Sequence, residues 1–273
     1  MNPISLIITT YNRPDALALV LNALTVQTFE RFEVIVADDG SKPETQQLLK
    51  TLRLPYPLHH VWQQDDGFRA AMARNRAVAK ATGSYLIFLD GDCIPRPNFV
   101  EQHWKLAEKN CFIVGNRILL NQSFSEHVIQ QHIPIWQWSR KQWLSAYLHK
   151  KINRLLPLLH LPFNFLRKTK HEKWQGAKTC NLAVWKTDFL KINGFDEYFQ
   201  GWGHEDADLV IRLLRSGIQR KEGRFALPVF HLWHPFCDRT QEQSNQQRLK
   251  QILQSQLIFA SKGLNQYLEN SGV

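Results

Sequence analysis

The chain has 273 residues, of which 44% are hydrophobic and 11% aromatic, so it can bury a large core and does not belong to the disordered class. No basic leader precedes an apolar stretch, and no segment reaches the roughly 18 uncharged apolar residues of a membrane span, so we expect a cytoplasmic protein. The net charge of +10 calls for an anionic partner, which nucleic acid, anionic lipid or a phosphorylated substrate would satisfy.

Between residues 4 and 89, short β-branched runs alternate with helical patterns. Asn12 is expected to cap the first helix, with Pro14 in its first turn, and Gly83 to stop the third. This alternation implies right-handed crossovers and a mainly parallel sheet, which is an α/β fold. The expected strands are 4–9, 33–37, 59–63 and 85–89, and the expected helices are about 14–26, 44–52 and 69–81.

The carboxyl ends of parallel strands meet at one edge of a sheet, and ligands bind beyond that edge. Residues 9–12, 38–41 and 90–92 follow three of the expected strands. The sequence therefore predicts that these segments line one crevice, although they are remote along the chain.

The alternation stops at about residue 121 and resumes near residue 174. We interpret 121–173 as a basic, aromatic helical insertion in one domain of residues 1–240, and 241–273 as a polar helical tail. An amphipathic helix is expected over 206–216, with Gly217 as its stop.

The insertion carries most of the net charge. Between Arg140 and Lys173 there are nine basic residues and one acid, Glu172, so about +8 lies there. Three roles are open for this segment: a helical cover over the core, contact with an anionic membrane surface through residues 136–173, or a groove that binds nucleic acid. Trp and Tyr beside lysines favour the membrane surface, and no nucleic-acid module accompanies them; the rings are Trp136, Trp138, Trp143 and Tyr147.

Asp90-Gly91-Asp92 follows an apolar strand and places two carboxylates around a glycine. A divalent cation held there can bridge a diphosphate and neutralise a leaving group, although surface turns also contain such triplets. His231 and His234 can supply further ligands, since imidazole suits Mn, Fe or Zn. On a strand their side chains would point to opposite faces, whereas in a turn they could converge.

Gly201-Trp202-Gly203-His204-Glu205-Asp206 places two acids where a helix begins. The acids can simply cap the helix. Alternatively, one is a general base beside a sugar-stacking tryptophan, because an attacking acceptor hydroxyl must lose its proton.

Asp38 and Asp39 end another strand and either form a turn or bind a nucleobase or ribose, with Thr9 and Tyr11 flanking the base. The chain has no GxGxxG after its first strand, no GxxxxGK[ST] and no GxSxG. These absences argue against dinucleotide, P-loop and serine-hydrolase sites.

With these motifs in view, residues 4–234 resemble family 2 glycosyltransferases of the GT-A fold. Two runs resemble the family's opening and the approach to its metal motif: ISLIITTYNRPDALALVLNALTVQTFERFEVIVADDGS and ARNRAVAKATGSYLIFLDGDCIP. A third run is similar to the C-terminal module of chondroitin polymerases and β-1,4-galactosyltransferases: NLAVWKTDFLKINGFDEYFQGWGHEDADLVIRLLRSG.

The resemblance implies an inverting transfer of a hexose or N-acetylhexosamine from a UDP-sugar to a glycan or lipid-linked glycan, with Mn²⁺ or Mg²⁺ as cofactor. It divides the domain into a nucleotide-binding half (about 1–120) and an acceptor and catalytic half (about 174–240). The implied catalytic residues are Asp206 as base and Glu205 as its partner. The implied nucleotide-sugar residues are Thr9, Tyr11, Asp39, Arg69, Asp90 and Asn181; Trp202 would bind acceptor, and Asp92 with His234 or His231 would bind metal.

One position departs from the galactosyltransferases, which carry a further acid directly after the Glu-Asp pair. Ala207 occupies that place here, and the next acid is Asp208. The rival hypotheses are a non-catalytic nucleotide-sugar or glycan-binding protein of the same fold, and a basic nucleic-acid-binding protein. The expected setting is the synthesis of bacterial surface polysaccharide or lipopolysaccharide at the inner face of the cytoplasmic membrane.

Overall fold

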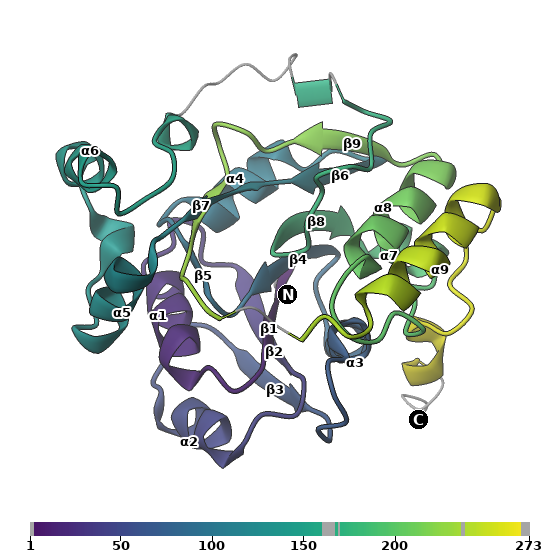
Figure 1. The fold of residues 1–273 in the computed structure, drawn as a ribbon, viewed down its shortest axis with the longest axis horizontal. Helices are drawn as coiled ribbons and strands as arrows, with labels where there is room; N and C mark the ends of the chain where they lie inside the picture. The colour runs from purple at the N-terminus through teal and green to yellow at the C-terminus, as the bar shows by residue number, and fades with distance from the viewer. Residues whose placement is uncertain (1–2, 160–166, 169, 236–237, 269–273) are drawn as a thin grey trace.

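The computed structural model describes residues 3–159, 167–168, 170–235 and 238–268. Its centre is a seven-stranded sheet with the order β3-β2-β1-β4-β8-β6-β9 (Figure 1). Strands β1 to β4 are parallel to one another, and β8 runs antiparallel to both of its neighbours. The strands are β1 (Ile4–Thr10), β2 (Phe32–Asp38), β3 (Leu58–Trp62), β4 (Tyr85–Asp90), β6 (Cys111–Val114), β8 (Asn181–Trp185) and β9 (Gln219–Glu222).

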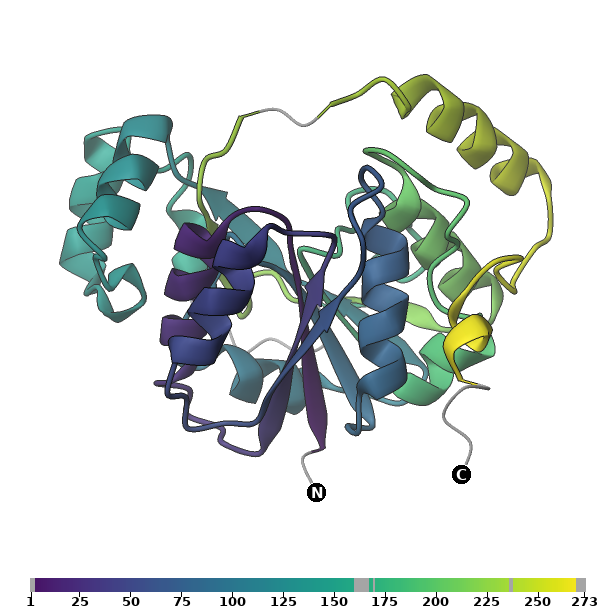
Figure 2. The ribbon, with the colours of Figure 1, turned by 90° about the horizontal axis from the view of Figure 1, so that it is seen from below.

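Helices cover both faces of this sheet, so its inner strands are buried on two sides and consist of near-continuous apolar runs. Figure 2 shows the strands between these two layers. The alternation of strands and helices expected from the sequence is confirmed. One face carries α1 (Pro14–Leu24), α2 (Pro43–Thr51) and α4 (Phe99–Leu106); the other carries α3 (Ala70–Lys80), α7 (Lys186–Lys191) and α8 (Glu205–Arg215).

A smaller three-stranded sheet, with the order β5-β10-β7, lies beside the large one. It consists of β5 (Cys93–Pro95), β10 (Pro228–His231) and β7 (Asn116–Leu119). β10 pairs antiparallel with β5 and parallel with β7, and His231 lies opposite Cys93. The small sheet therefore holds Cys93, the residue after Asp92, beside His231.

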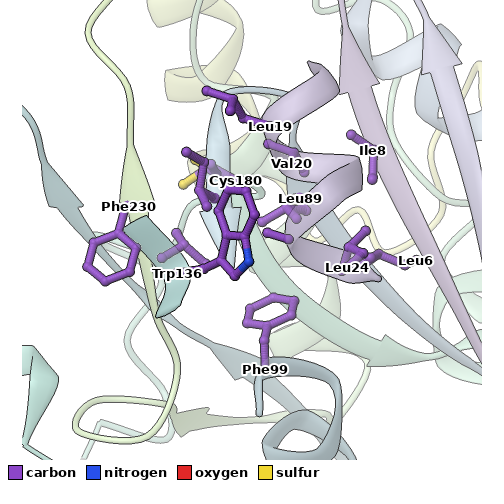
Figure 3. Close-up of a cluster of buried hydrophobic side chains, with 14 of the residues drawn as sticks. Leu6, Ile8, Leu19, Val20, Leu24, Leu89, Phe99, Trp136, Cys180 and Phe230 are labelled. Atoms are coloured by element: carbon purple, nitrogen blue, oxygen red, sulfur yellow. The ribbon is translucent and has the colours of Figure 1, made fainter. Parts of the chain in front are cut away.

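The segment expected as an insertion is helical in part, with α5 (Gln122–Gln130), η1 (Ile135–Gln137), α6 (Arg140–Leu148) and η2 (Leu156–Leu158). Two of its tryptophans pack into the core. Trp136 and Trp143 are 9% and 4% exposed, and the Trp143 ring stacks on Phe230 with centroids 4.0 Å apart. Figure 3 shows Trp136 among the core side chains. The interfacial role expected for these two rings is wrong, because both fill the core; residues 160–166 and 169 lie outside the described part.

Two expected helix ends differ from the structure. Asn12 does not cap α1: its side-chain Oδ1 accepts from the Lys42 N–H, and Arg13 is the capping residue, without a side-chain hydrogen bond. Gly83 does not stop α3, since Ala81 is already extended. A Cβ at Gly83 would lie 2.6 Å from the backbone nitrogen of Ser5, so glycine permits close approach to β1 there.

The tail contains α9 (Glu242–Gln254) and the short η4 (Leu264–Tyr267), and residues 269–273 lie outside the described part. Gly217, at φ 90°, follows α8 as the sequence predicts. Among the described residues, no helix combines the length and apolar character that crossing a membrane requires.

Candidate active site

The register of the parallel strands brings the expected site segments together. Thr9 lies beside Asp90, and Thr10 beside Asp38, at the carboxyl edge of the sheet. A cavity of about 460 Å³ opens at this edge. Ten of the residues predicted for the site line it: Thr9, Tyr11, Asp39, Asp90, Asp92, Trp202, Glu205, Asp206, His231 and His234.

Asp39 is a buried acid at one end of the cavity. One of its carboxylate oxygens accepts from Gln63 Nε2 at 2.7 Å, and the other accepts from the Arg69 backbone N–H at 2.7 Å. Burial raises the pKa of Asp39 to about 6, against the effect of these two donors. Asp38, by contrast, accepts from the Ser41 N–H and contacts His60, so it stabilises the turn.

Asp92, His231 and His234 form a cluster whose potential ligand atoms all lie within 4.8 Å of one another. Asp92 Oδ2 lies 3.7 Å from His231 Nε2 and 3.5 Å from His234 Nε2. The histidines converge because His231 ends β10 and His234 lies in the segment after it. Asp92 Oδ1 is buried without a hydrogen-bond partner. Two imidazoles and a carboxylate with an unsatisfied oxygen fit Mn²⁺ or another divalent cation.

Arg74 connects the two sides of the cavity and is 4% exposed. Its Nε donates to Thr9 Oγ1 at 2.9 Å, and its terminal nitrogens lie 3.2 Å from Asp90 Oδ1 and 3.5 Å from Glu205 Oε1. Burial raises the pKa of Asp90 to about 6, although the neighbouring Arg74 opposes this. The positive guanidinium thus offsets the negative charge of three nearby acids in the cavity, Asp90, Glu205 and Asp206.

Glu205 and Asp206 both line the cavity but have different partners. Burial, and then the charge of Asp206, raises the pKa of Glu205 to about 7. Asp206 accepts a hydrogen bond from the Thr179 hydroxyl, and Lys178 Nζ lies 3.9 Å from its other oxygen. The pKa of Glu205 is thus raised towards neutrality, whereas Asp206 is held by a hydroxyl donor.

The loop before α8 presents these acids by unusual backbone geometry. Gly201, Gly203 and His204 have φ values of 73°, 105° and 75°. The residue between the glycines, Trp202, lines the cavity, and the Arg239 guanidinium lies 4.4 Å from its ring centroid. A non-glycine residue held at positive φ stores strain, which typically occurs at functional sites.

Two residues expected at the donor do not line the cavity. Arg69 donates to the Gln64 carbonyl and pairs with Asp66 at 3.2 Å, in a separate cavity of about 250 Å³. Asn181 is 1% exposed, and its Nδ2 donates to the Leu227 carbonyl at 2.8 Å. A Cβ at Gly115 would lie 2.2 Å from this amide, so Asn181 is a buried structural crosslink.

Asp208, the acid closest to the position where galactosyltransferases carry theirs, also lies outside the cavity. It is fully buried and binds the Arg212 guanidinium at 2.5 and 3.0 Å. This pair stabilises α8 against the neighbouring loop, because Arg212 also donates to the carbonyls of Ile192 and Gly194.

Sequence reasoning missed several residues that line the cavity, among them Arg74, Arg117, Lys178 and Thr179. Arg74 lies in the run ARNRAVAKATGSYLIFLDGDCIP, which resembles the family, but no local sequence pattern distinguishes it from Arg69 or Arg76. Helical spacing is the signal that marks it: Arg74 lies one turn from Ala70 and from Ala77, on the face of α3 that packs on the sheet.

With this geometry established, comparison with known families matches residues 5–181 to glycosyl transferase family 2. Residues 163–234 match the family described as the N-terminal domain of galactosyltransferase. The two matches agree with the resemblance drawn from the sequence runs.

Two curated relatives are similar over most of this chain. The validoxylamine A glucosyltransferase of Streptomyces hygroscopicus subsp. jinggangensis is 30% identical over 226 residues, which is 79% of this chain and 52% of the relative. The chondroitin synthase of Escherichia coli is 29% identical over 235 residues, which is 78% of this chain and 32% of the relative. The chain thus spans about half the length of these relatives or less.

Solved structures share the fold at low sequence identity. S. aureus TarS 1–349, in complex with UDP, superposes with a TM-score of 0.64 at 13% identity, covering 97% of this chain and 68% of that one. The Pyrobaculum calidifontis mannosyltransferase PcManGT, in complex with GDP-Man and Mn²⁺, gives 0.55 at 15% identity, covering 84% and 56%.

Proposed function

This chain belongs to glycosyl transferase family 2, with a galactosyltransferase-like C-terminal region and the GT-A fold, and we propose that it is an inverting, metal-dependent glycosyltransferase. It would move a hexose or N-acetylhexosamine from a UDP-sugar to a hydroxyl of a glycan or lipid-linked glycan. The pathway we propose is the synthesis of bacterial surface polysaccharide or lipopolysaccharide.

One observation carries the proposal: the Asp92, His231 and His234 cluster and the Glu205–Asp206 pair line the same cavity. A transferase needs one group of residues for the leaving diphosphate and another for the attacking hydroxyl, with the sugar between them. A divalent cation, Mn²⁺ or Mg²⁺, bound by the cluster would supply neutralisation of the charge that develops on the diphosphate.

The proposed reaction is a single in-line displacement. The acceptor oxygen forms a bond to the anomeric carbon while the bond from that carbon to the β-phosphate oxygen breaks and leaves its electron pair on the diphosphate. The acceptor proton passes to Asp206, which Thr179 holds in place. Glu205, with Arg74, orients sugar hydroxyls. Attack opposite the leaving group inverts the anomeric configuration.

The remaining roles follow the position of each side chain. Asp39, with Thr9 and Tyr11 beside it, would bind the uridine, and Asp90 the ribose or a metal-bound water. Trp202 offers an aromatic face to the acceptor sugar. UDP is bound in a structure of TarS, and in another structure UDP-GlcNAc is bound, which supports a UDP-sugar donor here.

We further propose that the protein associates with an anionic membrane at the cytoplasmic face, where a lipid-linked acceptor would be available. The support comes from α6 and η2, where exposed apolar side chains lie near basic ones. Exposed apolar residues are Leu144, Tyr147, Leu148, Leu156 and Leu159; exposed basic residues are Arg140, Lys141, Lys150, Lys151 and Arg154. Between Glu126 and Glu172 the sequence contains no acid to offset them. Nucleic acid is not an expected partner.

The test is hydrolysis of a panel of UDP-sugars with and without Mn²⁺, with release of UDP as the readout. We expect slow, manganese-dependent cleavage of one donor, abolished by Asp92→Ala. Glu44→Ala, at an exposed position of α2, is the control and should cleave at the wild-type rate. Binding of UDP without cleavage of any donor or transfer to any acceptor would instead favour the non-catalytic alternative.

A further inference from the structure

Arg117, in the middle of β7, is a cation that lines the cavity. Within the part of the chain that the structure describes, no hydrogen bond or ion pair joins its guanidinium to another group. Its backbone carbonyl accepts from the Arg154 guanidinium. Arg74, which also lines the cavity, and Arg212 are by contrast both paired with carboxylates.

The small sheet fixes where the Arg117 side chain points. Leu119 is the direct partner of His231 across β7 and β10, and Arg117 is the direct partner of Val229. Side chains alternate along a strand, so Arg117 projects to the same face as Leu119 and therefore as His231. Arg117 thus lies on the side of the cavity formed by the Asp92, His231 and His234 cluster.

The surroundings keep this arginine charged. Burial alone would lower the pKa of Arg117, but nearby thiols and carboxylates, including those of Asp90 and Asp92, raise it on balance. The guanidinium lines the cavity and has no acceptor among the described residues, so its N–H donors are available to a bound ligand. A ligand anion at this place would supply the missing acceptors, and guanidinium matches phosphate oxygens in a bidentate geometry.

We propose that Arg117 binds the diphosphate of the donor and stabilises it as the leaving group. This role rests on the proposed function and replaces the one expected for Arg69, whose side chain lies in the other cavity. The diphosphate is the anion that fits, rather than a charged group on the acceptor, because Arg117 lies beside the cation ligands. Lys178 is the cation beside Asp206, where the acceptor would bind.

The inference is tested by equilibrium titration of UDP and of uridine against wild-type protein, Arg117→Gln and Arg117→Lys, each with and without Mn²⁺. Arg117→Gln should bind UDP about tenfold more weakly than wild type, since a charge-assisted hydrogen bond is lost. Its affinity for uridine, which has no phosphate, should equal that of wild type. Arg117→Lys, which keeps the charge but not the fork, should fall between the two in its affinity for UDP. Arg53→Gln, an exposed arginine outside both cavities, is the matched control and should not change either affinity.

The outcomes separate this inference from the proposed function. Equal UDP affinity of wild type and Arg117→Gln would overturn the role of Arg117 and leave the transferase proposal standing. Equal weakening of UDP and uridine would also overturn it, because that pattern indicates a structural effect. Failure of the wild-type protein to bind UDP would overturn both.

Discussion

At the scale of single residues, the neighbours of Glu205 and Asp206 separate the roles of two adjacent acids. Glu205 is 9% exposed, contacts Arg74 and has a pKa raised to about 7 by burial and by Asp206. Asp206 accepts from Thr179 and lies near Lys178. Because Glu205 is engaged by the buried Arg74 guanidinium and Asp206 is held by a hydroxyl donor, we propose Asp206 as the general base.

Asp206→Asn should lower turnover by roughly 10²-fold or more, the order expected for loss of a general base. The amide oxygen can still accept from Thr179, so folding and UDP affinity should be retained. Steady-state kinetics and a UDP titration would measure both quantities, with Asp188→Asn on α7 as the same change away from the cavity. Unaltered turnover would remove Asp206 from this role.

Glu205→Gln should change how the free energy of unfolding depends on pH. The raised pKa means that between about pH 4.5 and 7 the folded protein binds a proton that the unfolded chain has lost, so wild-type stability falls as pH rises through this range. Glutamine removes this penalty. The free energy of unfolding of the variant, relative to that of wild type, should therefore rise by on the order of 2 kcal/mol from about pH 5 to about pH 8.

Urea unfolding of metal-free wild type and Glu205→Gln, at about pH 5 and again at about pH 8, would measure this change in the free energy of unfolding. Glu44→Gln, on an exposed position of α2, should follow the wild-type curve. Parallel curves for Glu205→Gln and wild type would contradict the raised pKa.

At the scale of elements, α6 has two apolar sides with different roles. Trp143 and Ala146 pack inward, whereas Leu144, Tyr147 and Leu148 are 47%, 43% and 68% exposed. The sequence pattern alone could not separate these sides, because apolar residues occur all around the helix. The inward side covers β10, which ends at His231; the outward side is the part that supports a membrane contact.

Replacing Leu144 and Leu148 together with serine should weaken sedimentation with anionic vesicles by at least roughly tenfold at low salt, since each leucine loses apolar burial in the bilayer. Leu253→Ser with Leu257→Ser, at two exposed leucines in and after α9, is the matched control and should sediment like wild type. Wild-type protein that stays in the supernatant at low salt would contradict the membrane contact.

At the scale of the whole molecule, the sequence predicts the part of the site that follows from strand ends. Thr9, Asp39, Asp90 and Asp92 lie at or just after the ends of buried strands, and parallel pairing alone brings them together. Arg74 and Arg117 could not be found this way, because their positions depend on helix and sheet packing across the chain. Asn181 was misplaced for the same reason: a polar residue at the start of a strand looks the same whether it faces a ligand or Gly115.

The central claim is that one cavity holds both the metal and the nucleotide. Diffraction from crystals grown with UDP and Mn²⁺, with anomalous data to locate the manganese, tests it most directly. The account predicts manganese bound by Asp92 and at least one of His231 and His234, with the uracil beside Asp39. Manganese away from Asp92, or UDP bound in the smaller cavity beside Arg69, would contradict it.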